Sequence, residues 1–344
     1  MRVFACENCG AEARFGAQRC GTCGRDLAYL DDERDIRVLD ATSQPAVYTV
    51  AGRAGAVWRC LNSAWGCNWT VPAGATNPWC RACQLTRGRP DEARPDAIEA
   101  WAVAEAAKRR LLHQLDEMAL PVEPRSPTAP DGLAFDFVHL PGEGGITGHL
   151  EGIVTLDLAE VDDRHRDDLR RRLGEPFRTV IGHLRHEVGH HYWNRLVGQS
   201  NELVAFRRLF GDERQDYREA IEQHYAGAHP VWDQQRFVSP YAAAHPLEDW
   251  AESFAHYLHI VDATNTAVAH GLLPHDRAEQ MADLTTMIEA WRPVNAAINA
   301  IAESLGTPAV YPFDPSPMVL DKLAFVHRQI AAHTGRSRFY ADHD

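Results

Sequence analysis

The sequence predicts an α+β protein in which a small, cysteine-rich N-terminal region precedes a mostly helical body with a small sheet. Three observations predict this fold class. All eight cysteines lie between Cys6 and Cys83, apolar residues recur at helical spacing along much of the chain after residue 94, and two strand-like runs flank a glycine-rich turn. With 45% hydrophobic and 24% charged residues, the chain is typical of a soluble globular protein, and its 344 residues suffice for one large domain plus small modules or for two ordinary domains.

The cysteines fall into two sets with metal-ligand spacing. The first set consists of two C-x-x-C pairs, each followed by a glycine: Cys6, Cys9, Cys20 and Cys23. Four thiolates from two such turns surround one Zn²⁺ tetrahedrally at about 2.3 Å. This pattern predicts a zinc ribbon over residues 1–40 with a structural zinc ion.

The second set predicts another Cys₄ zinc site, in a ribbon-like module over residues 41–94. Its four members are Cys60, Cys67, Cys80 and Cys83. Because its first pair is spaced more loosely, free buried thiols or a disulfide remain alternatives. The start of the chain shows no apolar signal segment, and clustered cysteines in a cytosolic protein favour metal over disulfides. We therefore expect one or two structural zinc ions.

The charge distribution bears on what the ribbons bind. Residues 1–90 contain eleven Arg, no Lys and eight acidic side chains, a net charge of +3. The whole chain carries −13, so residues 91–344 carry −16. A mildly positive module on an acidic body is weak evidence for nucleic-acid binding. We expect the ribbons to contact or position a protein instead.

Residues 95–132 are predicted to form a helix and a linker. Apolar spacing predicts the helix from Pro95 to about Met118, and the proline-rich stretch Pro121 to Gly132 is typical of an exposed connection.

The remaining residues, 133–335, are predicted to form the main domain. Its strands are expected at 133–140 and 152–158, with a turn at 142–145. Short helices are expected between 201 and 237, and longer ones at 277–305 and 317–332, which would buttress the centre of the domain.

The chemistry of the chain centres on the H-E-x-x-H pattern His186-Glu187-Val188-Gly189-His190. Apolar spacing upstream predicts an amphipathic helix that continues to about Trp193. Residues four apart leave the same face of a helix, so both imidazoles can ligate one zinc ion at roughly 2.0–2.1 Å. Glu187 is then placed to act as general base on a zinc-activated water. The alternative is a buried helix whose histidines are hydrogen-bonded.

A third zinc ligand is expected in the helix that begins near Pro246. Glu248 and Glu252 share one face of this helix, and Glu248 is the preferred ligand. Glu252 would then orient a ligating group. The reverse assignment and a solvated acidic face remain alternatives. Other histidines near the motif are expected to be structural or packed rather than ligating: His183, His191, His224, His229 and His245.

The run H-E-V-G-H followed by E-x-x-A-E resembles the zincin metallopeptidases of the glutamate-ligand type, the gluzincins. More narrowly, the runs 182–193 and 239–252, with the cysteine-rich start, resemble a family of bacterial zinc-binding metallopeptidases that carry an N-terminal zinc ribbon. The resemblance implies a catalytic zinc ion and a peptide or protein substrate. It also implies that Tyr241, seven residues before Glu248, points its phenol at the zinc site, where it could stabilise an oxyanion.

The function we predict is therefore zinc-dependent hydrolysis of peptide bonds. Two other classes stay open: a zinc-ribbon adaptor whose zincin domain binds a partner without cleaving it, and a nucleic-acid-associated factor. No stretch of about 18 apolar residues occurs, so we expect no membrane span and a cytoplasmic protein.

Overall fold

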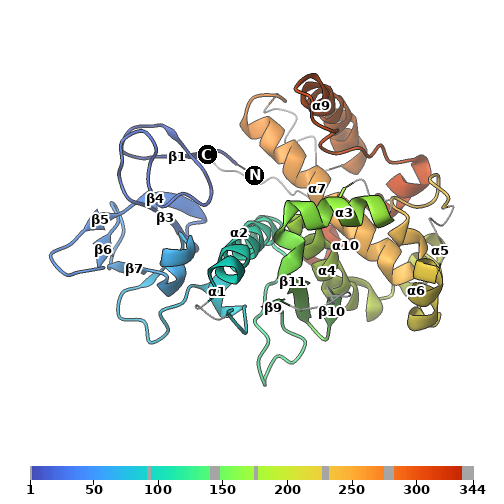
Figure 1. Cartoon of the computed structure of the whole chain (residues 1–344), viewed down its shortest axis with the longest axis horizontal. Coiled ribbons are helices and arrows are strands. Elements are labelled where there is room, and N and C mark those ends of the chain that lie inside the picture. Colours follow the sequence, from blue (N-terminus) through green and yellow to red (C-terminus); the bar gives the residue numbers. More distant parts are fainter. Residues whose placement is uncertain are drawn as a thin grey trace.

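The cysteine-rich region and the helical body lie on opposite sides of one long helix, α2 (Pro95–Glu117) (Figure 1). This computed structural model describes residues 2–90, 94–139, 148–173, 177–226, 232–274 and 283–334. Small sheets occupy the N-terminal region and helices dominate the rest, so the predicted α+β class is confirmed.

The N-terminal region is built from short antiparallel strands. These are the pairs β1 (Phe4–Ala5) with β2 (Glu12–Ala13) and β3 (Leu27–Leu30) with β4 (Asp35–Val38), and a four-stranded sheet of β5 (Asp40–Ala41), β6 (Tyr48–Thr49), β7 (Val57–Arg59) and β8 (Thr70–Pro72). A 3-10 helix, η1 (Leu61–Trp65), and a short helix, α1 (Arg81–Gln84), complete it. Gly10 and Gly24, with φ of +71° and +73°, follow the two C-x-x-C turns, where their N–H groups donate to the carbonyls of Cys6 and Cys20. This left-handed conformation explains why glycine follows each pair.

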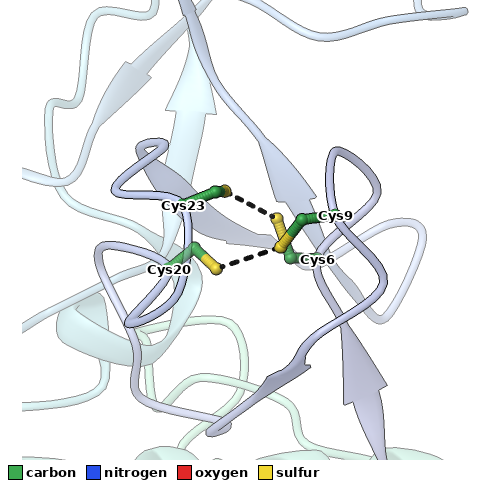
Figure 2. Close-up of side chains that lie close together, drawn as sticks. All are labelled: Cys6, Cys9, Cys20 and Cys23. Atoms are coloured by element: carbon green, nitrogen blue, oxygen red, sulfur yellow. Dashed lines mark hydrogen bonds between the residues drawn. The ribbon is translucent and has the colours of Figure 1, made fainter.

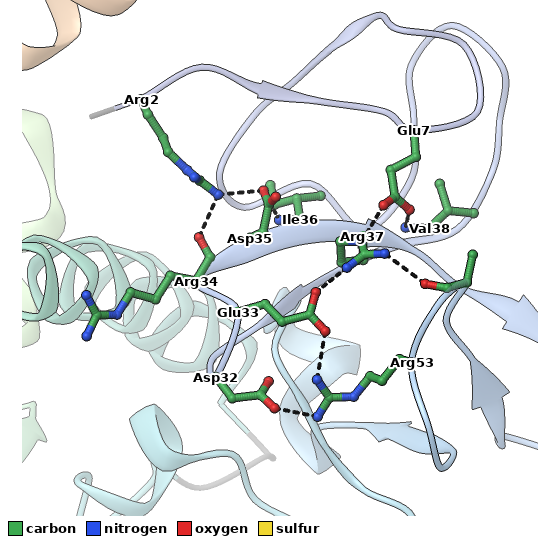
Figure 3. Close-up of polar contacts among 11 residues, drawn as sticks. Arg2, Glu7, Asp32, Glu33, Arg34, Asp35, Ile36, Arg37, Val38 and Arg53 are labelled. Atoms are coloured by element: carbon green, nitrogen blue, oxygen red, sulfur yellow. Dashed lines mark hydrogen bonds and ion pairs between the residues drawn. The ribbon is translucent and has the colours of Figure 1, made fainter. Parts of the chain in front are cut away.

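Ion pairs tie the first cysteine module to the second. Arg53 pairs with Asp32 at 2.5 Å and with Glu33 at 2.8 Å, and Arg37 pairs with both Glu33 and Glu7 (Figure 3). The side chain of Arg53 belongs to the second module and its two acidic partners follow β3 of the first. The two modules therefore form one connected unit.

Helix α2 confirms the helix predicted from Pro95, with proline at its first position. Its middle, around Glu105, lies against the second cysteine set through buried polar groups. Lys108 Nζ donates to Glu105 Oε1 at 2.7 Å and also to the Thr86 hydroxyl, which follows that cysteine set. Its C-terminal half meets the first module, where the Tyr29 hydroxyl is hydrogen-bonded to His113 Nδ1 at 2.9 Å.

The sheet of the body has three strands in the order β10-β11-β9. β9 (Ala134–Val138) runs parallel to β11 (Ile153–Asp157), and β10 (Gly148–Leu150) pairs antiparallel with β11 at the edge. β9 and β11 lie within the two predicted runs. Residue 140 and the predicted turn at 142–145 lie outside the described residues. The edge strand β10 was not predicted, because three residues are too few for a recognisable alternation.

The helices of the body follow the sheet. They are α3 (Asp163–Leu173), α4 (Val180–Trp193) with a π-helical turn η3 (Asn194–Gly198), α5 (Leu203–Leu209), α6 (Tyr217–Ala226), the 3-10 turn η4 (Tyr241–Ala243), α7 (Pro246–Ala269), α9 (Leu284–Ser304) and α10 (Pro317–Thr334); a 3-10 turn η2 (Leu158–Val161) precedes them. The helix predicted from 277 is described from Leu284, and residues 277–282 lie outside the described part. Among the described helices, none has the length and apolar content that crossing a bilayer requires.

Helices α4 and α7 pack closely because Gly189 has no side chain. A Cβ atom at Gly189 would lie 3.1 Å from the Cα atom of Ala251 and 3.3 Å from Cβ of Phe254. Trp250 Nε1 donates to the Gly189 carbonyl at 2.8 Å across the same contact. The close approach brings the H-E-x-x-H helix against the helix that carries Glu248 and Glu252.

A buried ion pair fastens α10 to the first turn of α7. Lys322 Nζ donates to Asp249 Oδ2 and to the Arg236 carbonyl, each at 2.6 Å, and both charged side chains are buried. Removing one partner of a buried pair leaves the other charge uncompensated.

We expect Lys322→Met to lower the free energy of unfolding in urea by about 3–5 kcal/mol. Lys322→Met combined with Asp249→Leu should recover much of that loss, because no unpaired charge then remains. The exposed pair Arg292–Asp314 offers a control, and Arg292→Met should change stability by less than about 1 kcal/mol. Equal effects of Lys322→Met and Arg292→Met would contradict the structural role of the pair.

Candidate metal centre and active site

Both cysteine sets are assembled as the spacing predicted. In the first set, Sγ atoms of Cys6 and Cys23, and of Cys9 and Cys20, lie 3.7 Å apart (Figure 2). Thiolates 2.3 Å from a zinc ion sit about 3.8 Å from one another at the corners of a tetrahedron. The observed distances therefore fit a Cys₄ zinc site.

The second cysteine set has the same geometry in a different environment. Sγ of Cys67 lies 3.7 Å from Sγ of Cys80 and 3.8 Å from Sγ of Cys83. All four side chains of this set are buried, whereas Cys9 and Cys23 of the first set are exposed. The described cysteines thus form two Cys₄ sites, one at the surface and one inside the protein.

The third cluster joins α4 and α7. Nε2 of His186 lies 3.2 Å from Nε2 of His190, and Oε2 of Glu248 lies 3.0 Å from the first nitrogen and 3.4 Å from the second. Ligands 2.0–2.1 Å from a tetrahedral zinc ion are separated by about 3.3–3.4 Å. The three atoms therefore have the separations that one face of a zinc site requires, whereas Glu252 faces the other nitrogen of His186.

Glu252 holds the other nitrogen of His186. Its Oε1 lies 2.7 Å from His186 Nδ1, and its Oε2 accepts a hydrogen bond from Ser239 Oγ at 2.6 Å. A proton on Nδ1 leaves a lone pair on Nε2 that faces Glu248. Burial favours the neutral acid of Glu252, but the hydrogen bonds from His186 and Ser239 outweigh it and lower its pKa to about 2.

The electrostatics of this cluster call for a cation. Oε2 of Glu248 is buried and has no hydrogen-bond partner among the described residues, although two imidazole nitrogens face it. Burial opposes protonation of His186, yet the carboxylates of Glu248 and Glu252 raise its pKa well above the ordinary value. Three atoms with lone pairs that converge in this way can ligate a divalent metal ion. Imidazole nitrogen and carboxylate oxygen are ligands that suit zinc.

Glu187 lies beside the two imidazoles, with a carboxylate oxygen within 4.8 Å of their ligand atoms. It lines an open cavity of about 130 Å³ together with His186, Tyr241 and Glu252. Burial raises the pKa of Glu187, and the charge of Glu248 adds to this effect. A carboxylate with a raised pKa beside a metal site is suited to accept a proton.

Two tyrosines lie close to the candidate metal site. Tyr217, on α6, donates to Glu248 Oε1 at 2.6 Å. The ring of Tyr241 lies 5.7 Å from the ring of His186, and the charges of Glu248 and Glu187 contribute to the raised pKa of Tyr241. Burial is the largest cause of that shift, so the phenol keeps its proton and remains a donor.

Sequence reasoning missed three contacts of the site. Tyr217 and Ser239 carry no pattern that marks them, because their partners are reached only through the packing of α6 and of the segment before α7. His149, on the edge strand β10, stacks on His190 with ring centroids 6.3 Å apart, and it lies in a strand too short to predict.

The other histidines near the motif do not enter the ligand face. His183 Nε2 lies 3.4 Å from Glu160, and the ring of His191 packs against Tyr192. His245 caps α7 by accepting from the N–H of Leu247, and the ring of His224 lies against Tyr241. His229 lies outside the described residues.

Comparisons with known proteins match both regions of the chain to described families. Residues 97–329 match the family described as "Putative zinc-binding metallo-peptidase", and residues 3–94 match a zinc-ribbon domain. Uncharacterized proteins of Mycobacterium bovis and of two Mycobacterium tuberculosis strains are each 40% identical over 334 residues, which cover 95% of this chain and 94% of each relative. No solved structure matches the chain.

Proposed function

Because the chain belongs to this zinc-binding metallopeptidase family, we propose that it hydrolyses peptide bonds at a zinc ion held by His186, His190 and Glu248. One observation carries the proposal. The ligand atoms of these residues converge to within 3.0–3.4 Å of one another beside the carboxylate of Glu187. A purely structural histidine pair would not need three acceptors to face one point.

A zinc ion bound there would polarise the scissile carbonyl and lower the pKa of a coordinated water towards about 7. Glu187 takes the proton of the attacking water and later passes it to the leaving amine. Tyr241 donates to the carbonyl oxygen as negative charge develops on it. Glu252, itself held by Ser239, keeps the proton of His186 on Nδ1, so that Nε2 can ligate the metal. Tyr217 orients Glu248 by donating to Oε1, the carboxylate oxygen that does not face the imidazoles.

The test is to measure zinc per chain and peptide cleavage on dialysed protein, beside the variant Glu248→Ala. We expect three zinc ions in the wild type, because three donor clusters are present, and two in the variant. Cleavage of a mixture of unstructured peptides should disappear with the third ion. A Glu289→Ala variant, altered at an exposed glutamate of α9, should keep three ions and full cleavage.

Each contrary result would have a distinct meaning. Three zinc ions in both the wild type and Glu248→Ala would move the ligand role to Glu252. Two ions in both proteins would mean that the H-E-x-x-H helix is empty, and a non-cleaving adaptor would then be the better description.

A further inference from the structure

The cavity beside Glu187 ends in a group of rings and hydroxyls that the hydrolytic mechanism does not use. From the H-E-x-x-H helix the cavity extends to Phe177, Thr179, His256, His259 and Phe313. These residues come from the start of α4, the middle of α7 and the segment after α9. A substrate side chain next to the scissile bond would enter this end of the cavity.

The proton of His259 is placed by a buried arginine. Nη1 of Arg185 donates to His259 Nδ1 at 2.6 Å. A guanidinium stays protonated, so Nδ1 must accept and Nε2 must carry the proton of the neutral ring. Burial, reinforced by the charge of Arg185, lowers the pKa of His259 well below its ordinary value, which keeps the ring neutral.

His256 is held in the same way by Tyr311. The Tyr311 hydroxyl is hydrogen-bonded to His256 Nδ1, and burial keeps that phenol protonated. Donation from the phenol leaves the proton of His256 on Nε2. Burial also lowers the pKa of His256 to about 4. The hydrogen bonds of the His259 and His256 rings within the described part of the chain use Nδ1 and leave both Nε2–H groups available to a ligand.

Gly182 has no side chain at the point where a donor and an acceptor lie close together. A Cβ atom at Gly182 would lie 3.5 Å from His259 Nε2 and 2.9 Å from Thr179 Oγ1. The hydroxyl oxygen already accepts from the Gly182 N–H and keeps a second lone pair. An N–H donor and an oxygen acceptor thus lie on either side of Gly182, and Phe177 lies beside them.

No unpaired cation faces this end of the cavity among the described residues. Arg178 is paired with Glu160 at 2.6 Å, and Arg185 with Asp262 at 2.7 Å. The carboxylates of Glu187 and Glu252 line the same cavity. A carboxylate side chain entering here would lose its hydration without gaining an opposite charge. An aliphatic side chain would leave the imidazole donors without partners.

We propose that this part of the cavity selects a substrate side chain that ends in a carboxamide, asparagine or glutamine, next to the scissile bond. The amide oxygen accepts from His259 and His256, and the amide N–H donates to Thr179. This inference rests on the proposed hydrolysis for the position of the bond, while the pocket itself is a binding site that can be tested alone.

The first arm of the test is cleavage. Zinc-loaded wild type is incubated with a random peptide mixture, and cleavage sites are read by mass spectrometry. We expect Gln or Asn on one side of the cleaved bond, with kcat/KM at least about tenfold above matched peptides with Glu or Leu there, since a site built for hydrogen bonds rejects analogues that lack them. His259→Asn keeps an acceptor for Arg185 but removes Nε2–H, and it should reduce this preference about tenfold.

Two further variants define the pocket. Gly182→Ala adds a Cβ atom 2.9 Å from Thr179 Oγ1 and 3.5 Å from His259 Nε2, so it displaces the proposed hydroxyl acceptor and should also reduce the preference for Gln over Leu. His270→Asn, at an exposed histidine beyond the end of α7, should leave both rate and preference unchanged. If His259→Asn and Gly182→Ala keep the preference for amide side chains, the inference is overturned. Cleavage by the wild type without any such preference would also overturn it, while the proposed hydrolysis would stand.

The second arm is binding, which separates the two proposals. A fluorescent Gln peptide and its Glu and Leu counterparts are titrated onto zinc-loaded protein carrying Glu187→Gln. The Gln peptide should bind more tightly than the Glu and Leu peptides, and this difference should disappear when His259→Asn is added to Glu187→Gln. That result supports the pocket even if the wild type cleaves nothing and the hydrolytic proposal fails. Equal binding of the three peptides overturns the pocket.

Discussion

Replacing Glu187 with Gln is expected to leave the zinc content at three ions per chain and to lower kcat/KM for peptides by about 10³-fold. Glutamine has nearly the same shape, so the buried position beside His186 and His190 stays filled. What disappears is the carboxylate that accepts a proton from the attacking water. Because burial raises the pKa of Glu187, the group lost is a stronger base than an ordinary surface glutamate.

Zinc analysis beside steady-state kinetics decides this prediction. A matched control is Glu202→Gln, at an exposed position before α5, which should change neither quantity. Retained turnover in Glu187→Gln would remove Glu187 from the role of base. Loss of one zinc ion together with activity would instead mean that the carboxylate helps to hold the metal.

Local spacing explains why part of the site could be predicted. His186, Glu187 and His190 are placed by one helical turn, and Glu248 and Glu252 by another, so the only non-local requirement is that the two helices meet. Gly189 allows this meeting, because it has no side chain and Ala251 lies against it. The order of Glu248 and Glu252 needed the structure, which turns the first towards both imidazole Nε2 atoms and the second towards Nδ1 of His186.

The parts that could not be predicted depend on long-range packing. Tyr217 reaches Glu248 across 31 residues, and Arg185 reaches Gln114 and Asp262 across more than 70. Neither residue lies in a pattern with its partner, since a hydrogen bond between distant elements leaves no periodic trace. For the same reason the ion pair Lys322–Asp249 could not be predicted from the sequence, although it links α10 to the first turn of α7.

The division of the N-terminal region at residues 40 and 94 remains a prediction, and the contacts show how strongly its parts depend on one another. Asn68 donates to the carbonyl of Phe15, and Gln18 donates to the carbonyls of Ser63 and Cys67. Buried apolar side chains as far apart in sequence as Phe4 and Ile330 belong to one connected hydrophobic core, beside which a second, smaller cluster lies in the N-terminal region. The buried cysteine site therefore lies inside the same packed structure as the candidate active site.

We expect Cys80→Ser to destabilise the whole chain, while Cys9→Ser mainly removes one zinc ion. Structural zinc contributes about 10–16 kcal/mol of apparent binding free energy in small zinc modules, as much as the total stability of an ordinary domain. Cys80 belongs to the site whose four side chains are all buried, next to Glu105 of α2, whereas Cys9 is exposed. The thermal midpoint should fall by about 10 °C or more for Cys80→Ser and by clearly less for Cys9→Ser.

A route of contacts links the buried cysteine site to the metal-binding helix. Loss of that zinc ion frees the segment around Thr86, which Lys108 of α2 holds, and so loosens α2. Further along α2, Gln114 accepts two hydrogen bonds from Arg185, which immediately precedes His186. We therefore expect Cys80→Ser to retain at most one zinc ion per chain, and Cys9→Ser to retain two.

Wild-type protein provides the same test without a substitution. During slow titration with a zinc chelator, the exposed site should release its ion first with little change in helical ellipticity. Release from the buried site should coincide with loss of ellipticity and of the third ion, because α2 then no longer supports Arg185. Independent release of three ions at constant ellipticity, or equal thermal midpoints for Cys80→Ser and Cys9→Ser, would show that the buried zinc site is not part of the scaffold of the active site.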